Sequence, residues 1–459
     1  MDGEDTLRPA GFKPPKIKMA QWPLSTWSLL RVMVRNPVAT VPPAAYQEPH
    51  ASLLVGRQAM FYPSDPALVE AILVRKHEDF AKSSIDNRLL NPILGNGILT
   101  AEGNAWRWQR RLAAPTFRAA TLSNHLPVMR SPFEELVGRW MLSPGPHRID
   151  DAMTAATIAV ICRAFFSNFD QGDADRVSGA IARYLRPSSW PITYGALGLP
   201  AWTPHPGKLT MKRAAADARQ LVWSFVARRR QGRKDPPDLA QILMDARDPE
   251  TGRALSDEDL VNMFLTLIAA GHETSANALS WALYCLAAQP DLQDALADHV
   301  RNVIGDGPVE APHLEALPDV THFIEETMRL LPPVPLLSRR PLRLCQIGGH
   351  SIEPKMLVLI PIYAIHRHRT LWSSPNDFDP ERFASGSQTQ RPRCAFMPFG
   401  AGPRICLGAS FAMMEMVAGL ATMLAALRFR LHDKTPPEPM HRITLRPRKE
   451  VVLRLELRP

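Results

Sequence analysis

One short stretch governs the interpretation of this chain: Phe399-Gly400-Ala401-Gly402-Pro403-Arg404-Ile405-Cys406-Leu407-Gly408. It places a cysteine in a glycine-rich loop, and an apolar helical run follows directly. Glycines let the backbone turn tightly and approach a flat, bulky group, because they have no Cβ atom. Peptide N–H groups at the start of a helix favour an ionised thiol, which is the form that binds a metal. The stretch therefore predicts a cysteine ligand in a shaped loop.

The number of cysteine ligands restricts the kind of metal site. No second Cys or His stands at zinc spacing from Cys406, which argues against zinc and against an iron–sulfur cluster. A single soft ligand is enough where the iron arrives already held by four other donors, as in haem. The alternative is an ordinary buried cysteine in a loop.

The loop resembles the proximal haem-binding loop of the cytochromes P-450, the haem–thiolate monooxygenases. That family's pattern is Phe-x-x-Gly-x-Arg-x-Cys-x-Gly, and this sequence meets every fixed position with Phe399, Gly402, Arg404, Cys406 and Gly408. The resemblance implies haem b as the cofactor, Cys406 as the axial ligand of its iron, and Gly400 as part of the cradle. It also implies the cytochrome P-450 fold, which is mainly α-helical with a minor β region.

Composition places few limits on the chain. The 459 residues are 45% hydrophobic, enough to bury a large core. The five cysteines are scattered and odd in number, so we expect no disulfide framework and a cytoplasmic location. No apolar segment follows the acidic N-terminus Met1-Asp2-Gly3-Glu4-Asp5, so we expect no signal peptide and no membrane anchor. The most membrane-like run, 409–427, is interrupted by Glu415 and is expected to be a buried core helix.

The net charge of +9 is compatible with nucleic acid, an anionic membrane or an acidic protein as partner. No nucleic-acid module is visible, so we expect no nucleic-acid partner. The one dense basic run, Arg228-Arg229-Arg230 with Arg233-Lys234, is expected to be a solvated helix end.

The pattern of breakers predicts one domain. A Pro-rich arm over residues 1–45, with a short helix near Leu24–Val34, precedes a single haem domain over 46–459. Periodicity and breakers predict helices at 65–75, 105–185, 208–230, 237–248, 257–288 and 291–331. Short strands are expected at 51–55, 58–62 (turning at Gly56-Arg57), 343–347, 356–361, 443–445 and 451–457.

Two segments are predicted to be loops. Breakers divide Ser83–Leu99, and the Pro- and Gly-rich segment Pro187–Pro206 also carries aromatic residues. The second loop suits a lid over an apolar cavity or a surface touching membrane, and packing on the protein's own core is the alternative.

The long helix predicted at 257–288 contains Ala270-Gly271-His272-Glu273-Thr274. Gly is poor inside a helix, and the Thr274 hydroxyl is expected to bond the Ala270 carbonyl, so we expect one loosened turn. A kink filled by packing is the alternative. The motif resembles the family's oxygen-binding groove. That resemblance implies that Thr274 bonds dioxygen, that Glu273 relays protons, and that a gap beside Ala270-Gly271 makes room for oxygen.

Further motifs match the family in order. Glu326 and Arg329, with Arg382 in Pro380-Glu381-Arg382-Phe383, resemble its buried Glu–Arg–Arg network, whose role is structural. Trp106 and Arg110 match its Trp-x-x-x-Arg pattern for one haem propionate. Arg339, preferred over its neighbour Arg340, matches the position for the other propionate, and Arg404 completes the set. His272, His366 and His368 form no metal triad and are expected to be ordinary hydrogen-bonded residues.

No flavin or iron–sulfur module is visible, so we expect electrons to come from NAD(P)H through a separate ferredoxin or flavodoxin and its reductase. We also expect the protein to be a monomer. Arg107, Arg111 and Arg393 flank proximal motifs and are candidates for a basic docking site.

The expected activity is insertion of one oxygen atom from O2 into a lipophilic small molecule. By family position its cavity is lined by 83–99, 187–206, 264–270, 334–337 and the region of Ile443. A peroxide-driven haem–thiolate peroxygenase and a non-catalytic haem sensor or carrier are the alternatives.

Overall fold

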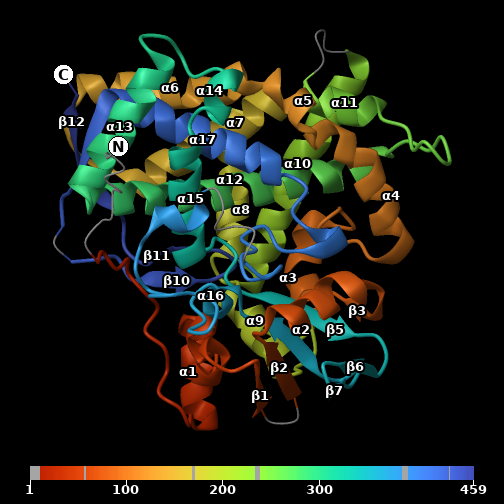
Figure 1. Ribbon diagram of the computed structural model, residues 1–459. Coiled ribbons are helices and arrows are strands. Elements are labelled where there is room, and N and C mark those ends of the chain that lie inside the picture. The colour runs from red at the N-terminus through yellow and green to blue at the C-terminus, as the bar shows by residue number, and fades with distance from the viewer. Residues whose placement is uncertain are drawn as a thin grey trace.

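Helices form most of the molecule, and the strands gather at its lower end and left edge (Figure 1). The computed structural model describes residues 11–55, 58–167, 171–232, 238–384, 391–433 and 435–458. The longer helices are α1 (Thr26–Arg35), α3 (Ser84–Leu94), α4 (Gly103–Ala113), α6 (Leu126–Leu142), α7 (Ile149–Phe165), α8 (Gln171–Leu185), α9 (Ser189–Ala196), α10 (Lys208–Gln231), α12 (Asp257–Ala287), α13 (Pro290–Ile304), α15 (Pro318–Leu330) and α17 (Ala409–Ala426). The shorter ones are α2 (Pro66–Glu70), α5 (Ala119–Ser123), α11 (Leu239–Asp245), α14 (Ala311–Glu315) and α16 (Ile362–Ile365).

The strands form small sheets. The largest has the order β1-β2-β8-β5-β3, from His50–Val55, Gln58–Pro63, Leu357–Ile360, Leu337–Pro341 and Phe80–Ala81. A second has the order β4-β12-β9, from Gly145–Arg148, Val452–Leu457 and Leu427–Leu431. Two antiparallel pairs remain: β6 (Cys345–Ile347) with β7 (His350–Ile352), and β10 (Pro439–His441) with β11 (Leu445–Pro447). In β1–β2, Ala51 pairs with Tyr62 and Val55 with Gln58.

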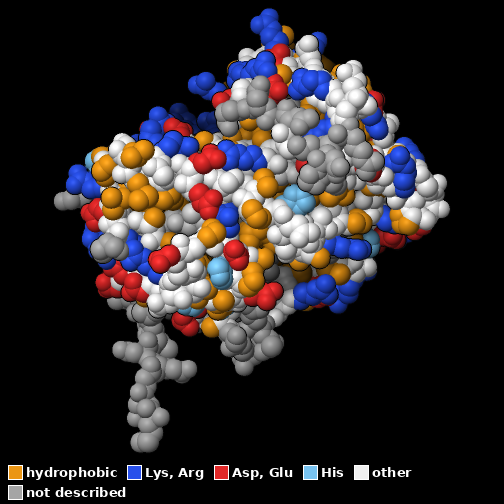
Figure 2. Space-filling model, turned by 90° about the horizontal axis from the view of Figure 1, so that it is seen from above, with side chains coloured by type: hydrophobic (Ala, Val, Ile, Leu, Met, Phe, Trp, Pro, Cys, Tyr) orange, Lys and Arg blue, Asp and Glu red, His pale blue; other side chains and the backbone are white. Residues whose placement is uncertain are grey.

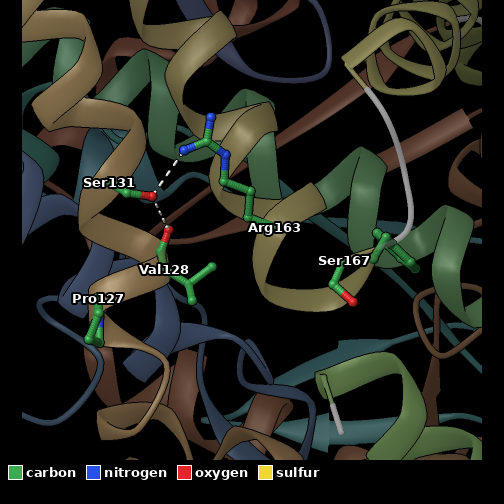
Figure 3. Close-up of a pocket in the computed structure, with 6 residues that line it drawn as sticks. Pro127, Val128, Ser131, Arg163 and Ser167 are labelled. Atoms are coloured by element: carbon green, nitrogen blue, oxygen red, sulfur yellow. Dashed lines mark hydrogen bonds between the residues drawn. The ribbon is translucent and has the colours of Figure 1, made fainter. Parts of the chain in front are cut away.

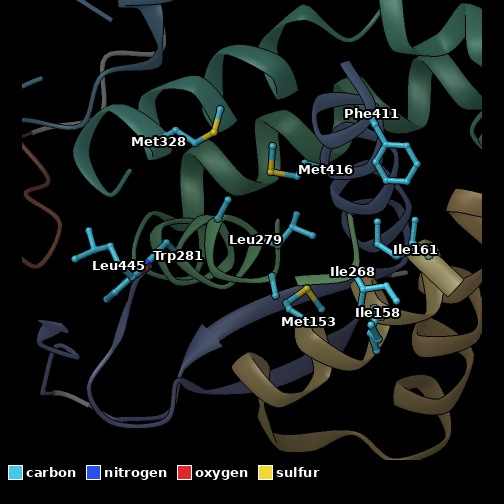
Figure 4. Close-up of a cluster of buried hydrophobic side chains, with 14 of the residues drawn as sticks. Met153, Ile158, Ile161, Ile268, Leu279, Trp281, Met328, Phe411, Met416 and Leu445 are labelled. Carbon is cyan, nitrogen blue, oxygen red and sulfur yellow. The ribbon is translucent and has the colours of Figure 1, made fainter. Parts of the chain in front are cut away.

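The central element is α12, which packs against α7, α10, α15 and α17. Its N-terminus has the predicted capping box: the Ser256 hydroxyl and the Asp259 carboxylate each bond the other residue's backbone N–H. Figure 4 shows side chains of α12 meeting those of α7, α15 and α17 in one cluster. Because α12 is buried along most of its length, it is a rigid base for any side chain that it presents.

The two predicted loops are wrong in part, because each contains a helix. In the first, the Ser83 hydroxyl accepts from the Asp86 N–H and starts α3, and Gly95 ends it with a φ of +59°. The second contains α9, which packs on α1 and α3, and a Cβ atom at Gly195 would lie 2.8 Å from Ile85. Tertiary packing outweighs the poor helix propensity of the Pro and Gly residues in both segments.

The described part of the N-terminal arm lies on the core rather than extending from it. Ile17 and Val38 are buried, and the Ile17 N–H donates to the Tyr363 hydroxyl at 3.0 Å. The first ten residues and the turn at Gly56-Arg57 lie outside the described residues. The predicted helix in the arm corresponds to α1.

The expectation for the basic run at the end of α10 is wrong for its middle residue. Arg229 is 3% exposed and donates twice to Asp238, at 3.0 and 2.7 Å. Arg228 and Arg230 are the partly exposed neighbours, paired with Asp173 and Asp257. A burial pattern within three adjacent arginines depends on what α10 packs against, which composition does not reveal. Arg233-Lys234 lies outside the described residues.

Within the described residues, one helix, α17, has the length and apolar composition of a membrane span. More than half of it is buried, against α6, α13 and α12. It therefore occupies the position of a core helix, as its place directly behind the cysteine loop predicts.

Candidate active site

The cysteine loop is held in a conformation that its glycines permit. Gly400 and Gly402 have φ angles of +77° and +74°, in the left-handed region. A Cβ atom on Gly402 would lie 2.0 Å from the Leu73 carbonyl oxygen, so the loop can approach the 71–75 segment only with glycine there. The Cys406 N–H donates to the Phe399 carbonyl at 2.9 Å and closes the loop. The sequence thereby fixes where the sulfur lies relative to α17.

The Cys406 side chain is accessible to solvent, although protein surrounds it closely enough that burial is the main cause that raises its pKa. The Gly408 N–H and the Arg110 guanidinium lower the pKa of the thiol and so act against burial. A metal cation at the sulfur would favour the thiolate further.

Four cations from separate segments gather beside this loop. Arg110 donates to the Ile405 carbonyl at 2.8 Å, and the Arg404 guanidinium lies 4.3 Å from the centre of the Trp106 ring. Arg404 also donates to the Ala101 carbonyl and pairs with Glu102. Arg339 and Lys82 complete the set.

Arg339 is the least compensated of these cations. It is only 9% exposed, and within the described residues its side chain has no ion pair and bonds only the Ser338 carbonyl, at 2.8 Å. Burial lowers the pKa of its guanidinium, and the more distant Asp86 and Glu102 act against that effect. A buried guanidinium without an acidic partner favours the binding of an anion.

The structure brings Glu326, Arg329 and Arg382 together. Arg329 and Glu326 are fully buried and share two hydrogen bonds of 2.6 and 2.7 Å. Arg329 also donates to the carbonyls of His366, Pro375 and Asp377. The Arg382 side chain lies 3.6 Å from the same carboxylate. The network therefore joins α15 to the irregular segment that leads to the cysteine loop.

His366 extends this connection toward the loop. Its Nδ1 lies 3.1 Å from the Arg329 carbonyl, and its Nε2 accepts from the Met397 N–H at 3.0 Å. One ring nitrogen donates and the other accepts, so the ring is neutral. Burial lowers its pKa to about 3. His272 and His368 also make hydrogen bonds, as expected, to the carbonyls of Ile268 and Glu48.

The motif at 270–274 lies inside α12. The Thr274 hydroxyl donates to the Ala270 carbonyl at 2.8 Å, as the sequence predicts. The expected loosened turn is wrong, because α12 is one continuous α-helix from Asp257 to Ala287. A Cβ atom on Gly271 would lie 2.7 Å from Ile161 of α7, so this glycine allows close helix packing instead of breaking the helix. The side of Gly271 is thus filled, and Ala270 is the exposed residue of the pair.

The Glu273 carboxylate has a partner that the motif does not reveal. It accepts from the Thr444 hydroxyl at 2.7 Å, and the Thr444 oxygen accepts from the Asn277 amide at 3.1 Å. Thr444 is almost fully buried and lies in the segment just before β11. The chain of three side chains therefore ties α12 to a distant loop.

This arrangement is that of a known family. The model of the family described as Cytochrome P450 matches residues 36–454, nearly the whole chain. The chain belongs to the cytochrome P450 family. Cytochrome P450 4X1 of Mus musculus is 30% identical over 429 residues, which cover 87% of this chain and 82% of the mouse protein.

Other cytochromes P450 and related enzymes extend the likeness. Cyclooctatin synthase of Streptomyces melanosporofaciens is 29% identical, with 92% of each chain covered. Taurochenodeoxycholic 6 alpha-hydroxylase of Sus scrofa is 30% identical, with 88% of this chain and 83% of that protein covered. The crystal structure of the cytochrome P450DA heme domain superposes with a TM-score of 0.84 at 24% identity, covering 97% of this chain and 98% of that one. The predicted cytochrome P450 fold and the enzyme class, a cytochrome P450 monooxygenase, are confirmed.

The residues present fit the haem of a cytochrome P450. Cys406 supplies the one soft ligand, and Arg110 and Arg339 have no acidic ion-pair partner within the described residues. Lys82, Arg110, Arg339 and Arg404 together exceed their carboxylate neighbours, Asp86 and Glu102, by two charges. A dianionic haem would balance that excess. Sequence reasoning missed Lys82, Asp86 and Glu102, because only the fold places them beside Arg339 and Arg404.

Part of the expected cavity lining is wrong. Phe264 is fully buried and packs on Phe166 and Phe225, with ring centres 5.1 and 5.9 Å away. Only the C-terminal end of the 264–270 stretch faces open space, at Leu267, Ala269 and Ala270, which are not fully buried. The helical period separates the two sides, so a continuous stretch of α12 cannot line one cavity.

A separate pocket of about 370 Å³ lies at the surface between α6 and α7 (Figure 3). Its one charged lining residue, Arg163, donates to Ser131 at 3.0 Å and to the Glu135 carboxylate at 2.5 and 2.8 Å. The arginine is already paired, and the pocket contains none of the predicted site residues.

Proposed function

We propose that this cytochrome P450 is a haem–thiolate monooxygenase that hydroxylates a lipophilic small molecule with electrons from a separate redox protein. The observation that carries the proposal is the accessible Cys406 together with Arg110 and the buried Arg339, neither of which has an acidic ion-pair partner within the described residues. We assign residues 46–459 to the haem domain and 1–45 to the arm, whose described part, 11–45, packs on that domain. All five cysteines are free, which supports a reducing, cytoplasmic compartment.

The proposed cofactor site divides into two parts. Cys406 would hold the haem iron as a thiolate, within the loop from Phe399 to Gly408. Arg110, Arg339 and Arg404 would bind the propionates, with Trp106 packed against Arg404. When bound, the haem supplies the activation of dioxygen, and its thiolate ligand donates electron density that favours O–O cleavage.

The residues of α12 would serve proton delivery. The Thr274 hydroxyl already donates to the Ala270 carbonyl, so its oxygen remains free to accept a hydrogen bond from a water molecule. Glu273 would pass protons from the Thr444 side of the helix, where its carboxylate is held. Ala270 would leave space beside the cofactor.

A lipophilic substrate is supported by the apolar character of the proposed lining. The half-buried side chains of Leu90, Leu99, Leu267, Leu336 and Ile443 pack at the edge of the main core from four separate segments. Two of the relatives have names that specify a hydroxylase or a synthase, and the hydroxylase is named for a bile acid. We propose an apolar substrate of small-molecule size for this chain.

A ferredoxin or flavodoxin, reduced by NAD(P)H through its reductase, is the proposed electron donor. The three arginines proposed to bind it are less free than expected. Arg107 pairs with Glu78 at 2.7 Å, Arg111 with Asp248 at 2.8 Å, and Arg393 with Glu70 at 3.6 Å. Arg393 is the most exposed of them, at 69%, and is therefore the best candidate for a contact.

The decisive measurement is the visible spectrum of the purified protein, reduced and then exposed to carbon monoxide. A red-shifted Soret band supports a thiolate-ligated haem, and Cys406→Ser should abolish that band while the protein remains folded. A band typical of histidine ligation in the unmodified protein would refute Cys406 as the ligand.

The two alternatives differ in their use of electrons. A peroxygenase would form product with peroxide alone, and a sensor or carrier would form none. Substrate-dependent consumption of NAD(P)H with a surrogate ferredoxin and its reductase, giving a hydroxylated product, would support the monooxygenase. Product formation that requires added peroxide would support the peroxygenase instead of the monooxygenase.

A further inference from the structure

A cavity of about 500 Å³ at the lower end of the molecule contains two facing histidines (Figure 1). It is lined by residues of β1, α2 and the β6–β7 hairpin and by none of the cysteine loop. His50 is the first residue of β1, and His350 is the first residue of β7. The centres of their rings lie 4.0 Å apart, with an angle of 50° between the ring planes. The fold thus brings together two imidazoles that are far apart in the sequence.

The ring nitrogens of both histidines are free. His50 and His350 are half-buried, and within the described residues neither side chain makes a hydrogen bond or an ion pair. By contrast, the rings of His77, His125 and His147 each bond a backbone carbonyl. The opposite end of the molecule, seen from above in Figure 2, shows histidines that stand apart from one another. A neutral imidazole nitrogen without a hydrogen-bond partner keeps the lone pair that a metal ion binds.

Close packing fixes the position of His350. A Cβ atom on Gly348 would lie 2.2 Å from the Leu68 side chain, and the φ of Gly348 is +53°, so this glycine lets the β6–β7 hairpin pack tightly on α2. The buried Phe61 ring lies beside both histidines, with its centre 5.4 Å from that of His50 and 5.6 Å from that of His350. The two imidazoles therefore rest on a rigid apolar wall.

The start of β1 is fixed as well. The Pro49 carbonyl accepts from the N–H groups of Ser64 and Asp65, each at 2.8 Å. Ser64 is fully buried, and its hydroxyl has no hydrogen-bond partner within the described residues. The Asp65 carboxylate accepts from the Ala67 N–H at 2.7 Å and so already caps α2. A rigid site with a spare polar group beside it suits a bound ion better than an unoccupied surface hollow.

The charge around the cavity favours a cation. Glu48 lines the cavity and has no ion-pair partner within the described residues. Burial and His350 lower the pKa of His50, and the Glu48 carboxylate acts against them, so this carboxylate lies near the His50 ring. Among the described residues, the lining contains no Lys or Arg. Divalent transition metals such as zinc bind imidazole nitrogens together with carboxylate oxygens.

We propose that His50 and His350 bind one divalent transition-metal ion, such as Zn²⁺, in this cavity, with Glu48 supplying negative charge and water completing the coordination. No three metal-binding side chains are already gathered within the described residues, so the two imidazoles are the main protein ligands. At the usual nitrogen–metal distance, two bound imidazoles have ring centres about 5 Å apart, so a side-chain shift of about 1 Å is enough. The ion would tie β1 to the β6–β7 hairpin. This site does not depend on the proposed function.

Isothermal titration calorimetry of the full chain, purified without a histidine tag, tests the proposal with Zn²⁺ and Ni²⁺ as probes. We expect one ion per chain, and a midpoint of thermal unfolding that rises with Zn²⁺ concentration, because an ion that binds only the folded state stabilises it. His50→Ala and His350→Ala should each weaken binding about tenfold or more, since each removes one of two nitrogen ligands. Glu48→Gln should weaken binding severalfold.

The matched control is His147→Ala. His147 is a half-buried histidine on β4, and its Nε2 lies 2.6 Å from the Ser143 carbonyl oxygen. This variant should bind Zn²⁺ like the unmodified chain. No binding of either metal by the unmodified chain, or equal binding by His50→Ala, His350→Ala and the control, would overturn the proposal. The carbon monoxide spectrum of each variant reports the haem site independently, so failure of one proposal is distinguished from failure of the other.

Discussion

Single side chains at this site act through partners that are distant in sequence. Glu273 is predicted from its motif, but Thr444, which donates to it at 2.7 Å, lies in another part of the chain. Glu415 is fully buried on α17, and neither of its carboxylate oxygens has a hydrogen-bond partner within the described residues. The role of each carboxylate can be tested by a substitution that changes one group and keeps its neighbours.

Thr444→Val removes the hydroxyl that holds Glu273 and that accepts from Asn277. If Glu273 relays protons, the yield of product per NAD(P)H should fall severalfold and peroxide should accumulate, while substrate binding stays unchanged. Thr444→Ser keeps the hydroxyl and should behave like the unmodified enzyme. If both variants give the same yield of product per NAD(P)H, the role of Glu273 is structural only.

Glu415→Gln should change how stability depends on pH. Burial raises the pKa of Glu415 from 4.5 to about 8, with the nearby Ser275 hydroxyl acting weakly against that effect. Between these values the folded protein holds a proton that the unfolded chain loses, so the free energy of unfolding falls as pH rises from about 5 to 8. The variant should remove that slope and be more stable at pH 8 by on the order of a few kcal/mol.

Denaturant unfolding at pH 5, 6.5 and 8 measures this effect. The control is Glu134→Gln, a residue whose partner Arg130 lies one turn before it on α6. That change should alter the slope little, because the Glu134 side chain is 39% exposed and a helix pair at this spacing contributes little. A slope that persists in Glu415→Gln would mean that the buried carboxyl is not protonated in the folded protein.

At the scale of elements, glycines decide how closely neighbouring segments approach. Gly402 brings the cysteine loop against the 71–75 segment, and Gly271 brings α12 against α7. Both contacts are invisible in the local sequence, where the two glycines look like ordinary helix or loop breakers. For the helix at 84–94 the local sequence gives conflicting signals. Ser83 is recognisable as a cap residue, but Pro92 argues for a loop.

Gly402→Ala should be severely destabilising. The new Cβ would overlap the Leu73 carbonyl at 2.0 Å, and the φ of +74° is unfavourable for alanine. We expect a loss of about 3 kcal/mol or more, with loss of bound haem. Gly138→Ala on α6 is the control, because its φ is not positive and no atom would lie within 4 Å of the new Cβ. Thermal unfolding and the haem content of both variants check the prediction.

At the scale of the whole molecule, buried charge and surface charge have different roles. The Glu326–Arg329 pair, with Arg382 beside it, connects α15 to the segment that carries the cysteine loop. The network stabilises the fold only while all of its partners are present, because removal of one partner leaves buried charge without compensation. On the surface, Arg107, Arg111 and Arg393, the arginines that flank the proximal motifs, are each paired with a carboxylate.

Glu326→Gln should destabilise the fold by about 3–5 kcal/mol and lower the haem content, since the fully buried Arg329 loses its carboxylate partner. The neighbouring Glu325→Gln is the control. Burial raises the pKa of Glu325 to about 7, so it is already partly protonated and the change should cost much less. Similar losses in both variants would contradict the special role of Glu326.

Arg393→Glu should slow reduction of the enzyme by an acidic ferredoxin severalfold at low ionic strength, and the difference should vanish at high salt. Arg393 is chosen because its bond to Glu70 is long, at 3.6 Å, so little structure is lost. Arg454→Glu on the distant β12 should have no effect. Reduction rates that do not differ at any salt concentration would remove Arg393 from the docking site.

The sequence by itself predicted the cysteine loop, the long helix with its Thr274 and, through the family resemblance, the members of the Glu–Arg–Arg network. The first two predictions depend on local chemistry, namely a glycine pattern around a thiol and a helical period. Only the tertiary structure decided which cations are left without a carboxylate and where Glu273 is held. Those facts depend on which segments meet, and contacts between residues far apart along the chain leave no local pattern in it.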